Sequence, residues 1–348
     1  MAAAAGGGGG GSAAKAASPD RTFFRRAREQ GIKELTGHTK KVHTLAWSCD
    51  GKRLASGSVD KNVNVWRFGA SSSGTLDQEL KGHTDVVDQL TWDPTHPDLL
   101  ASASSDKSVR MWDGRSGKCA ANIPTKGENI NIAWSPDGNV IAVGDKEDQV
   151  SFIDKRTHTL LGAPWSHKVE VNEISWNAAG NLFFLTTGNG TVEVFEYGAK
   201  PPYENLWSLT AHTQNCYCLE FDPRDRYFAV GSADALVSLW DLATFTCVRT
   251  IDRLDWPVRT LGFSADGQHL AAGSEDLFIV VADVSTGETV HEITTDAATN
   301  ALAWHPTLPI LAFGCDRAAP DEDRRRPPSA EGAVRIFGAG VPAVDDSR

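Results

Sequence analysis

Short runs in which apolar and polar residues alternate recur along the chain. The runs "HTLAW" (43–47), "RLASGS" (53–58) and "NVNVW" (62–66) turn successive side chains to opposite sides, which is the period of a β-strand. The links between runs, such as "SCDG" (48–51) and "SPDG" (135–138), are rich in Ser, Asp, Pro and Gly, which favour turns. The pattern therefore predicts an all-β chain of short strands joined by turns.

The same order of strands and turns occurs seven times. One aromatic residue marks each copy, at Trp47, Trp92, Trp134, Trp176, Phe221, Phe263 and Trp304. Successive aromatics are 45, 42, 42, 45, 42 and 41 residues apart, and a fourth short strand, as in "FTCVRTI" (245–251), completes a copy. Four strands per repeat of about 42 residues, with Gly-His and Trp-Asp marks, are typical of a WD40 blade. The sequence predicts a seven-bladed WD40 β-propeller over residues 32–338.

The last repeat predicts how the ring closes. The repeat that Trp304 marks contains three strand patterns, "ALAW" (301–304), "ILAFGC" (310–315) and "GAVRIFG" (332–338). A pattern for a fourth, outer strand does not follow them. A spare strand pattern, "IKELT" (32–36), precedes the first Gly-His. We expect this N-terminal strand to complete the seventh blade, because two open sheet edges would otherwise invite aggregation.

The segments outside the repeats differ from them in composition. Residues 1–18 are Ala/Gly-rich and residues 339–348 end in the polar run "DDSR" (345–348), which predicts two disordered tails. Residues 19–31 carry several arginines and predict a short basic helix or arm that begins with a Ser-Pro cap. The insert at 317–332 combines Pro, Ala and mixed charge, and we expect it to be a flexible loop in the last blade.

Polar residues stand at matching positions in three repeats. In WD40 blades a Gly-His histidine, a strand Ser or Thr, a turn Asp and a Trp form a buried hydrogen-bonded chain, so that each polar group has a partner. The matching residues are His38, Ser56, Asp60 and Trp66 in the first repeat, His83, Ser102, Asp106 and Trp112 in the second, and His212, Asp234 and Trp240 in the fifth, which has Val230 at the hydroxyl position. We interpret these sets as structural tetrads. Asp106 is therefore a structural carboxylate rather than a catalytic one.

Charge and cysteine usage exclude several functions. The net charge of −11 argues against non-specific nucleic-acid binding by the whole surface, although residues 1–41 hold eight Lys/Arg against three Asp/Glu. No apolar run approaches the length of a membrane span, and the N-terminus does not read as a signal peptide. The six cysteines form no CxxC pair. They are expected to be small buried side chains in a reducing compartment, not a zinc or disulfide framework.

The sequence contains no P-loop, HExxH or GxSxG motif. His305, Cys315 and Asp316 include a possible nucleophile, but Cys315 follows an apolar strand with no base poised beside it. We predict a chain that is not an enzyme and needs no cofactor or metal, so that its function lies on its surfaces. Trp165 and Trp207 lie between repeats and are expected to pack rather than to bind a ligand.

Several stretches depart from a generic blade in a shared way. The segments Lys126–Asn131 and Asp255–Arg259 replace the usual Gly-His start, and "LFFLTTGNGTV" (182–192) is a further example. Together these stretches resemble the THO complex subunit 3 family over residues 36–338. The resemblance implies a nuclear, non-catalytic scaffold subunit of the THO/TREX assembly, which couples transcription to mRNP assembly and mRNA export.

The resemblance also implies the partners: other THO subunits, a DEAD-box RNA helicase and mRNA export adaptors, with RNA contacted indirectly and with no membrane or small-molecule substrate. Partner contacts are expected on the rim where each innermost strand begins. Alignment on the seven aromatics, together with one exposed-loop tryptophan, gives the rim residues Lys41, His43, Asp88, Glu128, Ile130, Glu170, Asn172, Tyr217, Trp256 and Arg259. A mixture of carboxylates with aromatic and Arg side chains is typical of protein interfaces.

Two other functions are compatible with the residues. The run "WDGR" (112–115) fits the WDxR box of substrate receptors of cullin-type ubiquitin ligases. The run "RTFFRRARE" (21–29), with the Arg324–Arg326 cluster, is compatible with direct RNA binding, in which Phe23 and Phe24 stack on bases. For this arm the sequence favours a short docking helix, capped by Ser18 and Pro19, over RNA binding.

Overall fold

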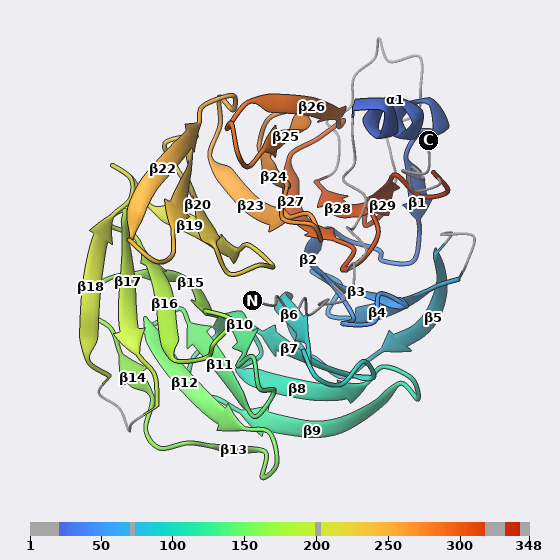
Figure 1. Ribbon diagram of the computed structural model, residues 1–348. Coiled ribbons are helices and arrows are strands. Elements are labelled where there is room, and N and C mark those ends of the chain that lie inside the picture. Colours follow the sequence, from blue (N-terminus) through green and yellow to red (C-terminus); the bar gives the residue numbers. More distant parts are fainter. Residues whose placement is uncertain (1–20, 70–73, 199–202, 317–330, 342–348) are drawn as a thin grey trace, which may run out of the picture.

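The fold is that of a computed structural model, which describes residues 21–69, 74–198, 203–316 and 331–341. Figure 1 shows seven small sheets arranged as blades around a central axis. The seven-bladed propeller is therefore confirmed. The expected tail at 1–18, the Ser-Pro cap, most of the insert at 317–332 and the last seven residues lie outside the described part of the chain.

Blades 1 to 4 follow one another along the chain. Blade 1 contains β2 (Val42–Trp47), β3 (Arg53–Ser58), β4 (Val63–Phe68) and β5 (Gly74–Leu80). Blade 2 contains β6 (Val87–Trp92), β7 (Leu99–Ser104), β8 (Ser108–Asp113) and β9 (Lys118–Pro124). Blade 3 contains β10 (Asn129–Trp134), β11 (Val140–Asp145) and β12 (Gln149–Asp154), and its outer strand is split into β13 (Thr159–Leu160) and β14 (Trp165–Ser166). Blade 4 contains β15 (Val171–Trp176), β16 (Leu182–Thr187), β17 (Thr191–Glu196) and β18 (Asn205–Thr210).

Blades 5 to 7 complete the ring. Blade 5 contains β19 (Cys216–Phe221), β20 (Tyr227–Ser232), β21 (Val237–Asp241) and β22 (Thr246–Ile251). Blade 6 contains β23 (Val258–Phe263), β24 (His269–Ser274), β25 (Phe278–Asp283) and β26 (Thr289–Thr294). Blade 7 contains β27 (Thr299–Trp304), β28 (Leu311–Cys315), β29 (Val334–Phe337) and, from the other end of the chain, β1 (Lys33–Leu35).

The second strand of each blade is buried on both faces, which the alternating pattern did not predict. In β3 only Arg53 is partly exposed, and the five residues that follow are buried. The cause is that blades pack face to face, so both sides of a middle strand meet a neighbour. Small residues allow this approach: a Cβ at Gly57 would lie 2.7 Å from side-chain carbons of Thr44 and Val87.

In blades 1, 2 and 3 the aromatic residue of the repeat joins its blade to the previous one around the ring. The indole N–H of Trp92 donates to the carbonyl of Ala46 at 3.0 Å, and that of Trp134 donates to the carbonyl of Thr91 at 3.3 Å. Trp47 makes the same bond to Ala303 of blade 7, at 3.1 Å. In these three blades the aromatic therefore couples the hydrophobic core of its own blade to the backbone of the preceding one, including across the seam of the ring.

The N-terminal strand closes the seventh blade, as predicted. β1 pairs with β29 in antiparallel register, with Lys33 opposite Ile336 and Leu35 opposite Val334. Leu35 is buried in a cluster that contains side chains of both blade 1 and blade 7. The first and last strands of the propeller thus belong to one sheet.

A buried arginine lies at this closure. Arg335 of β29 is 4% exposed. Its Nε atom is 3.2 Å from Oε1 of Glu34 on β1, and its Nη2 atom is 3.7 Å from Oδ1 of Asp296. A desolvated guanidinium needs opposing charge nearby, so the side chain ties the N-terminal strand to the loop between blades 6 and 7.

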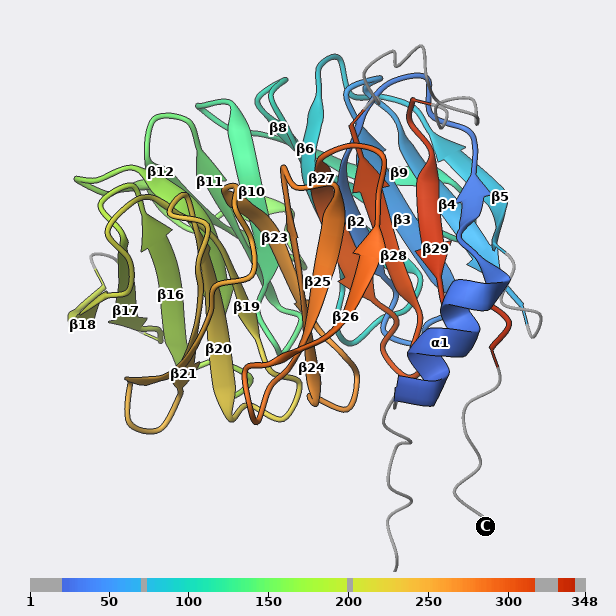
Figure 2. The ribbon, with the colours of Figure 1, turned by 90° about the horizontal axis from the view of Figure 1, so that it is seen from above.

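One helix, α1 (Arg21–Gln30), precedes β1. Figure 2 shows it at the outer edge of the disc, beside β26 and β29. Phe23, Phe24 and Ala27 are buried in the cluster formed by blades 6 and 7, and the ring of Phe24 stacks on His291 with centroids 5.1 Å apart. The alternative in which Phe23 and Phe24 stack on RNA bases is therefore contradicted, and the favoured docking helix is found: it uses both rings to pack on its own propeller.

Deletion of residues 1–36 removes α1 and β1, and we expect it to lower the melting temperature and to produce aggregates. The reason is that β29 then becomes an unpaired edge and the apolar surface under α1 meets water. The measurement is thermal unfolding combined with analytical ultracentrifugation. Deletion of the Ala/Gly-rich residues 1–17 is the control and should leave both readouts unchanged. An equal melting temperature for the two truncations would show that β1 does not hold the ring closed.

Candidate functional site at the channel rim

The hydrogen-bonded chains predicted for blades 1 and 2 are present. In blade 2, Nδ1 of His83 is 2.8 Å from Asp106 and Nε2 is 2.7 Å from the Ser102 hydroxyl, to which Trp112 donates at 2.8 Å. The blade 1 set has distances of 2.9, 2.8 and 2.9 Å. Its members are His38, Ser56, Asp60 and Trp66. All four side chains of each set are thus hydrogen-bonded while buried or half-buried.

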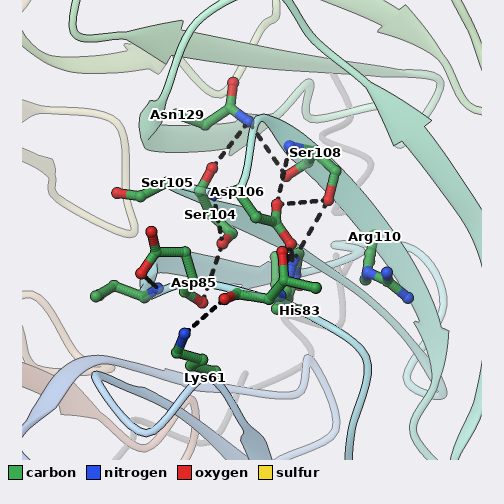
Figure 3. Close-up of polar contacts among 12 residues, drawn as sticks. Lys61, His83, Asp85, Ser104, Ser105, Asp106, Ser108, Arg110 and Asn129 are labelled. Carbon is green, nitrogen blue, oxygen red and sulfur yellow. Dashed lines mark hydrogen bonds and ion pairs between the residues drawn. The ribbon is translucent and has the colours of Figure 1, made fainter.

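Asp106 lies at the centre of a local network (Figure 3). It accepts hydrogen bonds from His83, from the Ser108 hydroxyl at 2.6 Å and from the backbone N–H of Thr84 at 3.0 Å. Burial acts to raise the pKa of Asp106, but these hydrogen bonds outweigh it and hold the pKa below its ordinary value. Because every contact of this carboxylate is with its own blade, it acts as a structural link.

The fifth blade also completes its chain, by a route that the sequence alignment missed. The Ser238 hydroxyl lies 2.8 Å from Nε2 of His212 and accepts the indole N–H of Trp240 at 2.8 Å, while Nδ1 of His212 is 3.1 Å from Asp234. Ser238 is the cross-strand partner of Val230. The hydroxyl therefore comes from the opposite member of the same residue pair. The sequence-based inference that blade 5 lacks a hydroxyl, drawn from Val230, is thus wrong.

Blade 6 replaces the same set by apolar residues. Counting from the strand starts, Leu254 and Ala272 stand where blade 1 has His38 and Ser56. Ala282 stands where blade 1 has Trp66, because it pairs with the second residue of the neighbouring strand as Trp66 does. All three residues are buried in one hydrophobic cluster. The turn aspartate remains as Asp276, and it accepts the backbone N–H groups of residues 255 and 256 at 3.1 and 3.2 Å. Removing the polar members together leaves no unpaired buried donor.

The residues considered for catalysis are not assembled. His305 and Cys315 lie at opposite ends of the β27–β28 pair. His305 is engaged by the carbonyl of Gly51 at 3.0 Å, and burial raises the pKa of the Cys315 thiol to about 11. Within the described residues no His/Cys/Asp/Glu group has the makeup of a metal site, and no helix there is long and apolar enough to cross a bilayer.

The expectation that the cysteines are buried is wrong for half of them. Cys216, Cys218 and Cys315 are buried, whereas Cys49, Cys119 and Cys247 are exposed, and all six are free thiols.

A β-bulge at the start of each innermost strand creates the rim. In blade 1, Val42 pairs with Ser58 and Thr44 pairs with Gly57, so one residue between them is unpaired, and the same shift recurs in all seven blades. Bulges redirect side chains at sheet edges. The bulged residues are His43, Asp88, Ile130, Asn172, Tyr217, Arg259 and Asn300. They include six of the predicted rim residues, and His43, Asp88, Ile130 and Arg259 line the central channel, a cavity of about 720 Å³.

Ion pairs hold much of the rim. The Lys41 ammonium is 2.7 Å from Asp316, and Lys146 is 2.6 Å from Glu128. Asp88 accepts the Ser105 hydroxyl at 2.7 Å. Burial raises the pKa of Asp88 and lowers the pKa of His43, whose Nδ1 is 3.9 Å away.

The remaining rim residues have different surroundings. Arg259 pairs with Glu275 at 2.7 Å, and its guanidinium carbon lies 4.7 Å from the centre of the Tyr217 ring. The Glu170 side chain is exposed, and the backbone carbonyl of Asn172 accepts a hydrogen bond from Asn131 at 3.0 Å. The rim therefore offers an aromatic–arginine stack at blades 5 and 6 and mainly charged or amide groups elsewhere.

The wall below the rim contains polar residues that sequence reasoning missed. Thr44 accepts the backbone N–H of Leu90 in the next blade, and Thr260 accepts that of Leu302, both at 3.2 Å. Gln89 likewise accepts the N–H of Ile132, and its amide donates across two blades to Glu173 at 3.0 Å. These residues share the third position of an innermost strand. A comparison of polar residues at that position in every repeat could have found them, but the rim was chosen from other positions. Burial raises the pKa of the Glu173 carboxyl to about 7.

The three singled-out tryptophans differ in exposure. Trp256, in the loop before β23, is 56% exposed. Trp165 is half-buried on β14 within an aromatic cluster, as expected. Trp207, on β18, contacts Phe245 with ring centroids 4.7 Å apart, yet 44% of it is exposed. Trp256 is therefore the rim side chain most available to a partner.

The residues of the "WDGR" run (112–115) have structural roles in the tetrad and in the turn that follows β8. Trp112 is buried in the tetrad, and Asp113 accepts the backbone N–H groups of Arg115 and Ser116 at 2.9 and 3.2 Å. Asp241 accepts equivalent bonds in blade 5. Of this run only the Arg115 side chain is exposed.

Comparison with known proteins gives a consistent result. The profile of the THOC3 beta-propeller domain matches residues 38–314. THO complex subunit 3 of Arabidopsis thaliana is 51% identical over 307 residues, which is 88% of this chain and 95% of the relative. WD repeat-containing protein AAC3 of Dictyostelium discoideum is 34% identical, covering 89% of this chain and 67% of the relative.

We expect Ser238→Ala to lower the free energy of unfolding by about 1–3 kcal/mol, because the Trp240 N–H and the His212 nitrogen lose their partner while buried. The double variant Val230→Ser/Ser238→Ala should recover most of this loss, since it places the hydroxyl where blades 1 and 2 carry it. The measurement is urea unfolding of both variants and of Val230→Ser alone. Additive losses without recovery would contradict an interchangeable cross-strand hydroxyl.

Glu173→Gln should make the free energy of unfolding fall less as the pH rises from about 4.5 through 7. The pKa of Glu173 in the folded chain, about 7, lies above the ordinary value of 4.5. Its contribution is therefore complete below about pH 4.5 and is lost as the pH rises through 7. The variant should match the parent near pH 4.5 and be the more stable protein at pH 8, as measured by urea unfolding across this range. An unchanged difference at the two pH values would contradict the raised pKa.

Proposed function

The chain belongs to the THO complex subunit 3 family, and from this premise we propose that it is a non-catalytic scaffold subunit of a nuclear THO/TREX assembly. In this role it couples transcription to mRNP assembly and mRNA export through protein–protein contacts. The proposal assigns no substrate, cofactor or metal to the chain.

The observation that carries the proposal is the extent of the match to THO complex subunit 3 of Arabidopsis. Identity of 51% extends over 95% of that relative, so the similarity includes the whole ring and not a few repeated WD40 marks. The closed ring supports it further, because it holds loops from seven blades in fixed positions. A rigid rim lowers the entropic cost of binding several partners.

The proposed partners are other THO subunits at the rim, with a DEAD-box RNA helicase and mRNA export adaptors in the larger assembly. RNA contact is indirect in this proposal. In support, Phe23 and Phe24 of α1 are buried and cannot serve as stacking platforms, and the net charge of the chain is −11. The exposed arginines of α1 are too few to offset that charge at long range.

Tagged full-length chain purified from nuclear extract is expected to recover other THO subunits, and nuclease treatment should not reduce that recovery. Arg115→Ala is the matched control for the cullin alternative and should change nothing. Recovery of cullin adaptors that is lost in Arg115→Ala would replace the proposal by a ubiquitin-ligase role. Recovery of RNA alone, abolished when Arg25, Arg26 and Arg28 are all changed to Ala, would replace it by direct RNA binding.

A further inference from the structure

Two large apolar side chains are exposed on neighbouring loops of blade 6. Trp256 precedes β23 and is 56% exposed, and Leu277 lies in the turn between β24 and β25 and is 52% exposed. The two loops are tied together, because Asp276 accepts the backbone N–H of Trp256 at 3.2 Å. An exposed aromatic beside an exposed aliphatic side chain is a candidate interaction surface.

The other blades act as internal references for these two positions. Counted from the start of the innermost strand, the residues that match Trp256 are Lys40, Asp85, Gly127, Val169, Gln214 and Ala297. Counted from the end of the second strand, the residues that match Leu277 in blades 1 to 5 are Lys61, Lys107, Asp148, Gly190 and Ala235. The fold therefore needs no large apolar group at either position, and blade 6 has one at both.

The patch is held rigid from below. Leu254, which replaces the tetrad histidine, is buried, and the Asp276 carboxylate is itself buried while binding the N–H groups of Asp255 and Trp256. On the inner side, Arg259 stacks on Tyr217 and pairs with Glu275. Because these contacts fix the loop before a partner arrives, little conformational entropy is lost on binding.

The charge around the patch is negative. Arg253 is paired with Glu292 at 2.7 Å, and Arg259 is paired with Glu275 at 2.7 Å. Asp252 and Asp255 are both exposed, and neither has an ion-pair partner among the residues that the structure describes. Two uncompensated carboxylates therefore border the apolar pair, which favours an approaching segment of positive charge.

We propose that this blade 6 patch, formed by Trp256, Leu277, Asp252 and Asp255, binds a basic segment of a partner protein that carries one large apolar anchor residue. The anchor packs between the indole and the leucine, and flanking Lys or Arg side chains pair with the two aspartates. A second copy of this chain would bring like charges together in a symmetric contact, and an RNA backbone would meet the same carboxylates. The identity of the partner as a THO subunit rests on the proposed function. Its positive charge and its apolar anchor are inferred from the patch alone.

The test places the photo-reactive residue p-benzoylphenylalanine at position 277 of the full-length tagged chain, followed by irradiation in nuclear extract and sequencing of the cross-linked peptide. The expected peptide comes from another protein, has net positive charge and contains a large apolar residue. In this background, Trp256→Ala should reduce the cross-linked yield at least about tenfold, and so should the charge reversal Asp252→Lys/Asp255→Lys. Trp207→Ala, which removes an exposed tryptophan of another blade, is the control and should leave the yield unchanged.

Several results would overturn the proposal. The first kind concerns the product: a cross-linked peptide that is acidic or belongs to this chain, or a cross-link to RNA. The second kind concerns the yield: a yield equal to that of a probe at Leu76 on the outer strand of blade 1, or equal losses with Trp207→Ala and Trp256→Ala. The test also separates the two proposals. Recovery of THO subunits with an acidic cross-linked peptide contradicts the patch alone, whereas a basic peptide from a protein outside THO contradicts the proposed function alone.

Discussion

The pairing of β1 with β29 is the interaction on which the rest of the propeller depends. Each blade buries both of its faces against neighbours, so the ring has no spare surface and a single open seam would expose two faces at once. Only three residue pairs join the two strands, but other contacts reinforce them. Leu35 enters the core shared by blades 1 and 7, Arg335 lies between Glu34 and Asp296, and α1 covers the same blade from outside. The rim has fixed geometry because this closure holds.

Blades 1, 2 and 5 satisfy the polar groups of the tetrad, and blade 6 replaces most of them by apolar residues. Blades 1 and 2 use a serine on the second strand, blade 5 uses Ser238 on the third, and blade 6 replaces the histidine, hydroxyl and indole by Leu254, Ala272 and Ala282. These solutions share one constraint, which is that the histidine, hydroxyl and indole of the set are either paired with one another or replaced together. In blade 6 the change also leaves Asp276 free to fix the loop that presents Trp256, so a structural substitution creates an available surface.

Period-two patterning and the 41- to 45-residue spacing were sufficient to predict the propeller, its seven blades and its closure, because these depend on features that repeat. Features that depend on a single three-dimensional neighbour were missed. Ser238 was missed because alignment compares residues along a strand and not across a pair. The burial of Phe23 and Phe24 depends on blades 6 and 7, which lie far away in the sequence. The link from Gln89 to Glu173 crosses the channel between blades 2 and 4, and no local pattern encodes it.

Hydrogen exchange of the full-length chain tests the central claim, that the ring opens as one unit through its closure. Peptides that cover β1 and β29 should exchange at the slow rate of the middle strands β3 and β7, because separating the closing pair unfolds the blades on either side. An exchange rate for β1 and β29 much faster than that of β3 and β7, with blades 1 and 7 still protected, would contradict the account. It would show that the closing strand frays independently and that the ring is held together by the packing of the blades alone.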